Sequence, residues 1–318
     1  MHTLLSTLHV MFTGCDIVHY HALGPALFSF LPRCAGTKTV VTVQGLDWRR
    51  SKWNWMASAV LHVGEKAAND FPNATITVSR NLHEHYRSKY LAETFYVPNG
   101  AVIRSSKEDG RLKQWGLESG KYILFLGRLS PEKNCHLLIE AYESLKPAVK
   151  LVLAGGSSYS DSYADELRRH RSDQIRVLNF VSGADLDELL TNAGLFVLPS
   201  DIEGLSLAIL DAMGAGVCVL VSDIPENREV VDGAGYTFKA GDIRDLERML
   251  RLLIENPLLG KAAAIKARER IQQSYLWPQV AKQIEEIYLK VLDRKLPPDI
   301  RKLPISVAEG VELDNRVA

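Results

Sequence analysis

Residues 121–134 read KYILFLGRLSPEKN and join an apolar strand to the start of a helix. Near-continuous apolar strands that alternate with helices are typical of a parallel sheet covered on both faces. Further strands of this kind, each followed by a helical segment, occur at 149–156, 175–182, 195–200 and 217–223. The series predicts a doubly wound, Rossmann-like α/β domain over 121–273.

The same alternation occupies the first part of the chain. Its clearest helix covers 51–70, and runs rich in β-branched residues occur at 16–22, 38–45, 74–79 and 94–100. The pattern pauses at Val97-Pro98-Asn99-Gly100, before the polar stretch RSSKEDGRLKQWGLESGK. We therefore predict a first Rossmann-like domain over 1–104 and a linker over 105–120.

Helical segments at 245–255 and 258–273 complete the second part. Residues 277–292 carry apolar side chains at helical spacing, so one face of this segment should pack on protein. We expect a helix over 274–293 that packs back on the first domain. The tail over 294–318 is rich in proline and mixed charge, and we expect it to be loose.

The composition excludes several classes of protein. The 318 residues, 46% of them hydrophobic, suffice for two domains with their own cores. Lysine plus arginine and aspartate plus glutamate balance at 38 each, which argues against a strongly basic surface that binds nucleic acid. No apolar run approaches the roughly 20 residues that cross a bilayer, and the N-terminus lacks the features of a signal peptide. We expect a cytoplasmic protein.

Two cations follow the strand in the opening stretch. Ligands of open α/β sheets bind outside the carboxyl ends of the strands, so Arg128 and Lys133 should lie at the mouth of a crevice. There the two side chains can hold a diphosphate. The alternative is a solvated turn whose charged residues are only exposed.

A second stretch, PSDIEGLSLAILD at 199–211, also leaves a strand and starts a helix. We expect free N–H groups from Gly204 to Leu207 to form an anion site with the helix dipole. Glu203 and Asp211 are eight residues apart, on the order of 12 Å along a helix. That span suits a nucleotide sugar, with one carboxylate on the sugar and the other on the ribose. Alternatively, Asp211 is an ordinary polar residue of an amphipathic helix.

These residues resemble a known family. GRLSPEKN at 127–134, followed by EGLSLAILDAMGAG at 203–216, is similar to family 4 of the retaining glycosyltransferases, which have the two-domain GT-B fold and the signature Glu, seven residues, Glu. The resemblance covers nearly the whole chain, including DIVHYH, TVQGLDW, VPNG, LVLAGGSS and ENREVV. It implies a transferase that moves a hexosyl group from a nucleotide diphosphate sugar to a glycan or lipid-linked acceptor, without a cofactor.

The resemblance also implies roles for single residues. Arg128 and Lys133 would bind the donor diphosphate, Glu203 would contact the transferred sugar, and Asp211 would contact the ribose. We count Arg128, Lys133 and Glu203 as catalytic, together with His21 near the acceptor. Further donor contacts are expected from Asn99, Gly127, Gly204, Leu205, Ser206 and Leu207.

Three polar residues are candidates for the acceptor side. His19 and His21 alternate on a strand, so both point to the same face, either toward the acceptor or as ordinary packed histidines. The resemblance places His19 and Gln44 on the acceptor side. Gln44 stands where many relatives have histidine, and a neutral amide can orient a hydroxyl but cannot take up a proton.

The chain departs from the family in two further ways. Asp211 is one methylene shorter than the family's glutamate, so we expect weaker ribose binding. The family's opening strand and glycine-rich loop do not precede Met1, so we expect an N-terminally incomplete first domain, from an incomplete reading frame or a late start codon. Two alternatives stay open: a GT-B-like sugar-nucleotide epimerase, and an impaired nucleotide-binding fragment or partner subunit.

Metal sites are not expected. Asp185-Leu186-Asp187 matches the DxD metal motif of another glycosyltransferase fold, but it opens a helix, where acids favour the dipole. The scattered cysteines form no CxxC pair and fit neither a disulfide framework nor a zinc site. We expect mostly buried, reduced thiols at Cys15, Cys34, Cys135 and Cys218.

An aromatic and basic segment precedes the first long helix. We expect its tryptophans to form a buried or packed helix face, with an acceptor platform or a membrane interface as alternatives. Basic residues beside them leave a peripheral contact with the inner face of the membrane open. The residues are Trp48, Trp53 and Trp55, with Arg49, Arg50 and Lys52.

Overall fold

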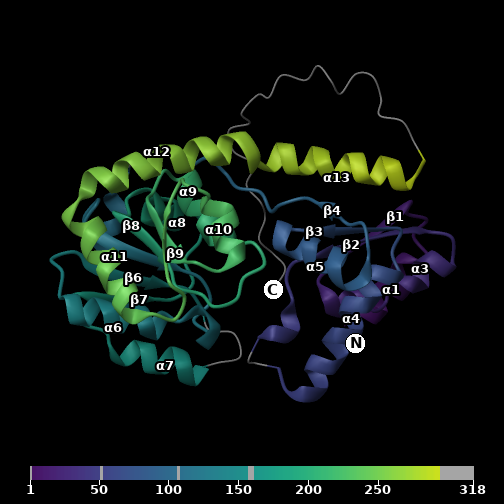
Figure 1. The fold of residues 1–318 in the computed structure, drawn as a ribbon, viewed down its shortest axis with the longest axis horizontal. Helices are drawn as coiled ribbons and strands as arrows, with labels where there is room; N and C mark the ends of the chain where they lie inside the picture. Colours follow the sequence, from purple (N-terminus) through teal and green to yellow (C-terminus); the bar gives the residue numbers. More distant parts are fainter. Residues whose placement is uncertain (1, 51–52, 106–107, 157–160, 294–318) are drawn as a thin grey trace.

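The computed structural model describes residues 2–50, 53–105, 108–156 and 161–293. Its two halves lie side by side, and each is built around one parallel β-sheet (Figure 1). The predicted α/β class with two parallel sheets is therefore confirmed. Lys52 and the tail over 294–318 lie outside the described residues.

The first sheet has four parallel strands in the order β1-β2-β3-β4. Its centre is filled by β-branched side chains, which pack well on a pleated surface. Val40, Val41 and Val43 of β2 and Ile76 of β3 are all buried. The strands are β1 (Ile17–His21), β2 (Lys38–Val43), β3 (Ala74–Thr77) and β4 (Phe95–Tyr96).

The second sheet has six parallel strands in the order β10-β9-β8-β5-β6-β7. Strand β5 lies between β6 and β8, so the chain runs outward from β5 in both directions. Open α/β sheets bind ligands in the crevice at such a reversal, outside the carboxyl ends of the two strands. Strand β10 was not predicted, because three residues give no recognisable apolar run. The strands are β5 (Tyr122–Leu126), β6 (Lys150–Ala154), β7 (Ile175–Leu178), β8 (Leu195–Leu198), β9 (Val219–Ser222) and β10 (Tyr236–Phe238).

One helix of the first half begins where its N-cap residue places it. The predicted helix over 51–70 starts only after Asn54, whose side chain accepts a hydrogen bond from the Ala57 N–H at 2.9 Å. The elements are α1 (His2–Val10), α2 (Leu23–Ala26), α3 (Phe30–Cys34), the 3₁₀ helix η1 (Asp47–Arg49), α4 (Trp55–Asp70) and α5 (Arg80–Tyr90).

The other described helices follow in the chain, and all of them except the last, α13, belong to the second half. Its helix predicted from residue 245 starts earlier, at Ile243, because Asp242 caps it through the Asp245 N–H at 3.1 Å. The elements are η2 (Gly110–Trp115), η3 (Pro131–Lys133), α6 (Cys135–Leu145), α7 (Asp161–Arg169), α8 (Gly183–Thr191), α9 (Leu207–Gly214), α10 (Pro225–Val231), α11 (Ile243–Glu255), α12 (Pro257–Ser274) and α13 (Trp277–Val291).

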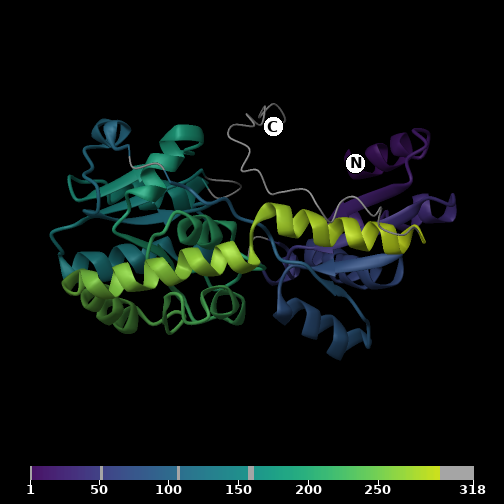
Figure 2. The same cartoon turned by 90° about the horizontal axis from the view of Figure 1, so that it is seen from above.

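The last two helices run along both halves of the molecule (Figure 2). Helix α12 packs on α9 in the second half. Helix α13 covers the first sheet, where Val280 and Ile287 are buried in one cluster with Val40, Ile76 and Val97. Helix α13 therefore contributes to the core of the first half.

The cysteines are free thiols, but they are not mostly buried. Cys135 and Cys218 lie in the core, and burial raises the pKa of Cys218 to about 12. Cys34 is exposed because it ends the short surface helix α3, and Cys15 is half-buried. The expectation of burial is therefore wrong for Cys34.

Candidate active site

The loops after β5 and β8 brace each other at the crevice. Pro131–Lys133 form the 3₁₀ helix η3, and Asn134 takes a left-handed conformation (φ +52°) before α6. The Asn134 side chain donates a hydrogen bond to the carbonyl oxygen of Pro199 at 3.1 Å. The Asp201 N–H donates to the carbonyl oxygen of Glu132 at 3.0 Å. The two sequence stretches that carry the predicted site thus form one braced corner.

Charged side chains converge on this corner. The Lys133 ammonium forms an ion pair with the Glu203 carboxylate, and the two side chains are only 13% and 9% exposed. Such shielding from water strengthens the attraction. The Arg128 guanidinium is more open, at 38% exposed, and lies 3.8 Å from the Glu132 carboxylate. Arg128 therefore keeps most of its hydrogen-bonding capacity for an anion.

The first half reaches the corner through three residues. A Cβ atom on Gly204 would overlap with the carbonyl oxygen of Gln44, so this position has room only for glycine. A Cβ atom on Gly45 would lie 3.5 Å from the Gly204 Cα. The Asn99 side chain donates a hydrogen bond to the carbonyl oxygen of Leu205 at 3.1 Å. Gln44 and Asn99 of the first half thus contact the loop over 203–206.

Helix α9 begins at Leu207, four residues after Glu203. Ser206 has the extended backbone of an N-cap residue (φ −74°, ψ 114°), which leaves Gly204 and Leu205 in the loop before the helix. The assumption of one continuous helix from Glu203 to Asp211 is therefore wrong. Only the N–H of Leu207, among the four predicted anion-binding groups, belongs to the first helical turn.

Asp211 is held by an arginine that the sequence analysis missed. Arg104 Nη2 lies 3.2 Å from Asp211 Oδ1, and Arg104 Nη1 donates a hydrogen bond to Asp187. Burial raises the pKa of the Asp211 carboxyl, and the Arg104 charge opposes that rise. No sequence signal marked Arg104, which lies in the polar segment between the strands of the first half and those of the second half. The hydrogen bond from Arg104 fixes the direction in which the Asp211 carboxylate points.

The two aspartates of the DxD sequence have arginine partners. Asp185 lies in the first turn of α8 and pairs with Arg111 at 3.0 Å, while Asp187 pairs with Arg104. Within the part of the chain that the structure describes, no group of three His, Cys, Asp or Glu side chains could hold a metal ion. The motif is accounted for by ion pairing at a helix start.

The two histidines of β1 do point to the same face, as predicted. Their rings stack with centroids 4.4 Å apart. His19 Nδ1 lies 2.6 Å from the Tyr288 hydroxyl of α13, and its Nε2 lies 2.7 Å from the Thr42 hydroxyl. His21 is exposed, so it is the freer of the two for contact with an acceptor.

Burial, aided by the nearby His21, lowers the pKa of His19 to about 4. An unfolded histidine titrates near about 6.5, so the unfolded chain binds more protons between these two pH values. Stability from neutral His19 is therefore present above about pH 6.5 and is lost as the pH falls toward 4. Between about pH 7 and 5, we expect the Tm of wild type to fall about 4 °C more than that of His19→Gln. Equal slopes in scanning calorimetry would contradict this.

The tryptophans near α4 do not form one packed face. Trp48 is half-buried, and its indole N–H donates to the Glu65 carboxylate at 2.9 Å. Trp53 and Trp55 are 39% and 79% exposed, because they precede Leu61, the first buried residue of α4. The expectation of a packed face is therefore wrong for Trp55.

Two parallel-sheet halves, whose strand-end loops meet around paired cations, define a glycosyltransferase of the GT-B class. The chain belongs to the family of glycosyl transferases group 1, whose model matches residues 110–273, just over half of the chain. The prediction of a GT-B glycosyltransferase is thereby confirmed, and the assignment to family 4 stays a prediction.

Individual relatives agree with this family. The glycogen synthase of Mycobacterium tuberculosis is 28% identical over 311 residues, which covers 91% of this chain and 72% of that protein. Sucrose-phosphate synthase from Thermosynechococcus elongatus superposes with a TM-score of 0.81 at 18% identity, over 92% of this chain and 77% of the other. Anabaena Alr3699/HepE in complex with UDP-glucose gives 0.79 at 20% identity, over 89% and 82%. These two structures have the same fold as this chain.

None of the helices that the structure describes is both long and apolar enough to span a bilayer.

Proposed function

We propose that this glycosyltransferase takes a hexosyl group from a nucleoside diphosphate sugar and keeps its anomeric configuration. The observation that carries the proposal is the corner that holds Arg128 and the ion pair of Lys133 with Glu203, opposite Gln44 of the first half. Two cations there can hold a diphosphate. UDP-glucose bound to HepE, which has the same fold, agrees with such a donor.

The difficult step is departure of the nucleoside diphosphate, on which negative charge accumulates as the bond to the anomeric carbon breaks. Arg128, Lys133 and the N–H groups before α9 supply the opposing field. Lys133 is neutralised by Glu203 in the free protein, so a bound diphosphate must share the ammonium with that carboxylate.

The acceptor side follows from the residues opposite the corner. The acceptor hydroxyl attacks the anomeric carbon on the face that the diphosphate leaves, and its proton passes to the departing phosphate oxygen. Gln44 orients that hydroxyl, and His21 contacts the acceptor. Glu203 binds the transferred sugar, and Asp211, held by Arg104, binds the ribose. No protein nucleophile takes part.

The direct test is product stereochemistry. The protein is incubated with UDP-glucose, ADP-glucose or GDP-mannose, with maltotriose or mannotriose as acceptor, and the first product is followed by proton NMR. Since all three donors are α-linked, retention gives an α-linked product. A β-linked first product would contradict retention. A new nucleotide sugar formed without acceptor would favour the epimerase, and nucleotide binding without turnover the impaired fragment.

We also propose a peripheral contact between α4 and the inner face of the membrane. Trp55, Met56, Val60 and Val63 are 79%, 55%, 53% and 60% exposed on this one helix. Met56, Val60 and Val63 share a face because they are four and seven residues apart. Residues 48–64 contain no aspartate or glutamate, and Arg49 nearby is exposed. An apolar face beside basic residues is typical of a helix that lies on anionic lipid.

Vesicle sedimentation tests the membrane contact. Replacing Trp55 and Met56 together by glutamate should lower binding to phosphatidylglycerol vesicles by about tenfold or more, since two charges would enter the interface. Phe180→Glu is the matched control, because Phe180 is 78% exposed in the other half. The contact is excluded if wild type stays in the supernatant, or if Phe180→Glu loses as much binding.

A further inference from the structure

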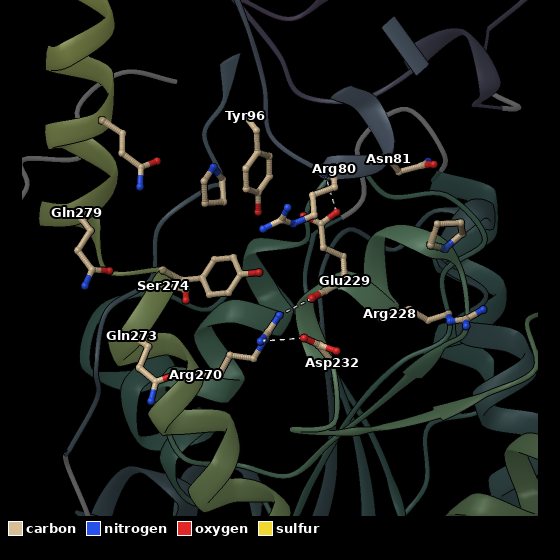
Figure 3. Close-up of a pocket in the computed structure, with 14 residues that line it drawn as sticks. Arg80, Asn81, Tyr96, Arg228, Glu229, Asp232, Arg270, Gln273, Ser274 and Gln279 are labelled. Carbon is tan, nitrogen blue, oxygen red and sulfur yellow. Dashed lines mark hydrogen bonds and ion pairs between the residues drawn. The ribbon is translucent and has the colours of Figure 1, made fainter. Parts of the chain in front are cut away.

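A cavity of about 1070 Å³ lies where the two halves and α13 meet (Figure 3). The first half contributes Arg80 and Tyr96, the second contributes α10 and the end of α12, and α13 contributes Gln279 and Gln283. None of the residues that line it belongs to the corner of Arg128, Lys133 and Glu203. The cavity is therefore a separate feature of the crevice between the halves.

The walls of the cavity are fixed by contacts between the halves and by contacts within the second half. The main-chain N–H of Arg80 donates to the Glu229 carboxylate at 2.7 Å. The side-chain amide of Asn81 donates to the Glu226 carboxylate at 2.7 Å. Arg270 donates to the carbonyl oxygens of Glu229 and Val230 at 2.8 and 2.7 Å. A preorganised wall loses little entropy when a ligand binds.

The lining mixes hydrogen-bond donors and acceptors. Arg80 and Arg228 only donate, and no carboxylate of the described residues lies within 4.0 Å of either guanidinium. Asp232 only accepts, and it pairs with Arg270 at 3.2 Å (Figure 3). The exposed amides of Gln273 and Gln283 do both. A ligand that fits must itself present donors and acceptors side by side.

Vicinal hydroxyl groups satisfy this condition, and a phosphate does not. A phosphate offers mainly acceptors and would lie near the carboxylates of Glu229 and Asp232. Neutral sugars offer both kinds of group, and their C–H faces can pack on the half-buried ring of Tyr96. Pockets for drug-sized ligands span about 300–1,000 Å³, so this cavity has room for more than one sugar ring.

We propose that this cavity is a second carbohydrate site, which binds a neutral oligosaccharide segment of the acceptor. It borders the donor corner, because Pro98 lines the cavity and the next residue, Asn99, holds the carbonyl oxygen of Leu205. A glycan at the corner can continue into the cavity and be retained between transfers. The inference rests on the proposed function only in taking the acceptor to be a glycan.

Direct binding without donor tests the site. Maltopentaose and mannopentaose are titrated into the full chain by calorimetry, with inorganic phosphate as a third probe. We expect at least one pentasaccharide to bind, and the Arg228→Ala/Gln283→Ala double variant to bind it at least about tenfold more weakly. Both side chains are exposed, and neither forms a hydrogen bond or ion pair with the described residues of the walls, so this variant should fold normally.

The controls separate this site from the donor corner. Arg244→Ala/Gln272→Ala removes the same two residue types from exposed positions outside the cavity and should bind like wild type. Lys133→Ala should also bind the pentasaccharide like wild type, whatever happens to nucleotide binding. The site is overturned if neither pentasaccharide binds at about 10 mM, if the double variant binds equally well, or if phosphate alone binds in an Arg228-dependent way.

Discussion

Replacing Gly204 by alanine is expected to reduce the transfer rate by about 100-fold, because misplacing the reacting groups by about 1 Å can cost that much. The new methyl group would overlap with the carbonyl oxygen of Gln44, so the loop over 203–206 must move away from the first half. That movement displaces Glu203 and the N–H groups before α9. The Tm should fall as well, because Gly204 is buried and the overlapping atom belongs to the backbone. The rates are therefore compared at a temperature at which both proteins are folded.

Gly24→Ala is the matched control for this variant. An added Cβ at Gly24 meets no heavy atom within 4 Å, and its backbone is not in the left-handed region. Its transfer rate should therefore equal that of wild type. If Gly204→Ala were as active as Gly24→Ala, the contact with Gln44 would have no role in the reaction.

Lys133→Ala is expected to weaken nucleoside diphosphate binding by roughly 1.5 to 3 kcal/mol, the value of a charge-assisted hydrogen bond. It should also lower the free energy of unfolding by about 2 kcal/mol, because it leaves the Glu203 carboxylate shielded and unpaired. That side chain is only 9% exposed. Calorimetric titration and urea denaturation measure the two effects separately.

A double variant distinguishes the two roles of Lys133. Adding Glu203→Gln to Lys133→Ala removes the unpaired charge, so stability should recover while nucleotide affinity stays low. Recovery of both properties would mean that Lys133 serves the ion pair alone and does not touch the donor. Unchanged affinity in Lys133→Ala would lead to the same conclusion.

The strands of both sheets could be predicted because their signal is local. Runs such as KTVVTV and YILFL are buried on both faces. Such short, nearly continuous apolar runs are typical of strands in a covered parallel sheet. Strand β10 and the start of α9 could not be predicted in this way. β10 has three residues, and Gly204 to Ser206 lie outside the helix in a segment whose composition also suits a helix.

The candidate site was predictable only in part. The carboxyl ends of β5 and β8 are adjacent, so the sequence could bring Arg128, Lys133 and Glu203 to one crevice. The sequence could not show that Lys133 pairs with Glu203, or that Arg104 pairs with Asp211. Such contacts depend on packing between residues far apart in the chain. The meeting of Gln44 with Gly204 depends likewise on how the two halves face each other.

The central claim is that this corner binds the diphosphate of the donor, and nucleotide titration of Arg128→Ala tests it most directly. Arg128 is 38% exposed and 3.8 Å from its nearest carboxylate, so removing it should leave the fold unchanged. We expect wild type to bind UDP, ADP or GDP, Arg128→Ala to bind it roughly 10 to 150 times more weakly, and Arg244→Ala to match wild type. Failure of all three nucleotides to bind wild type at millimolar concentration, or equal binding by Arg128→Ala, would contradict the claim.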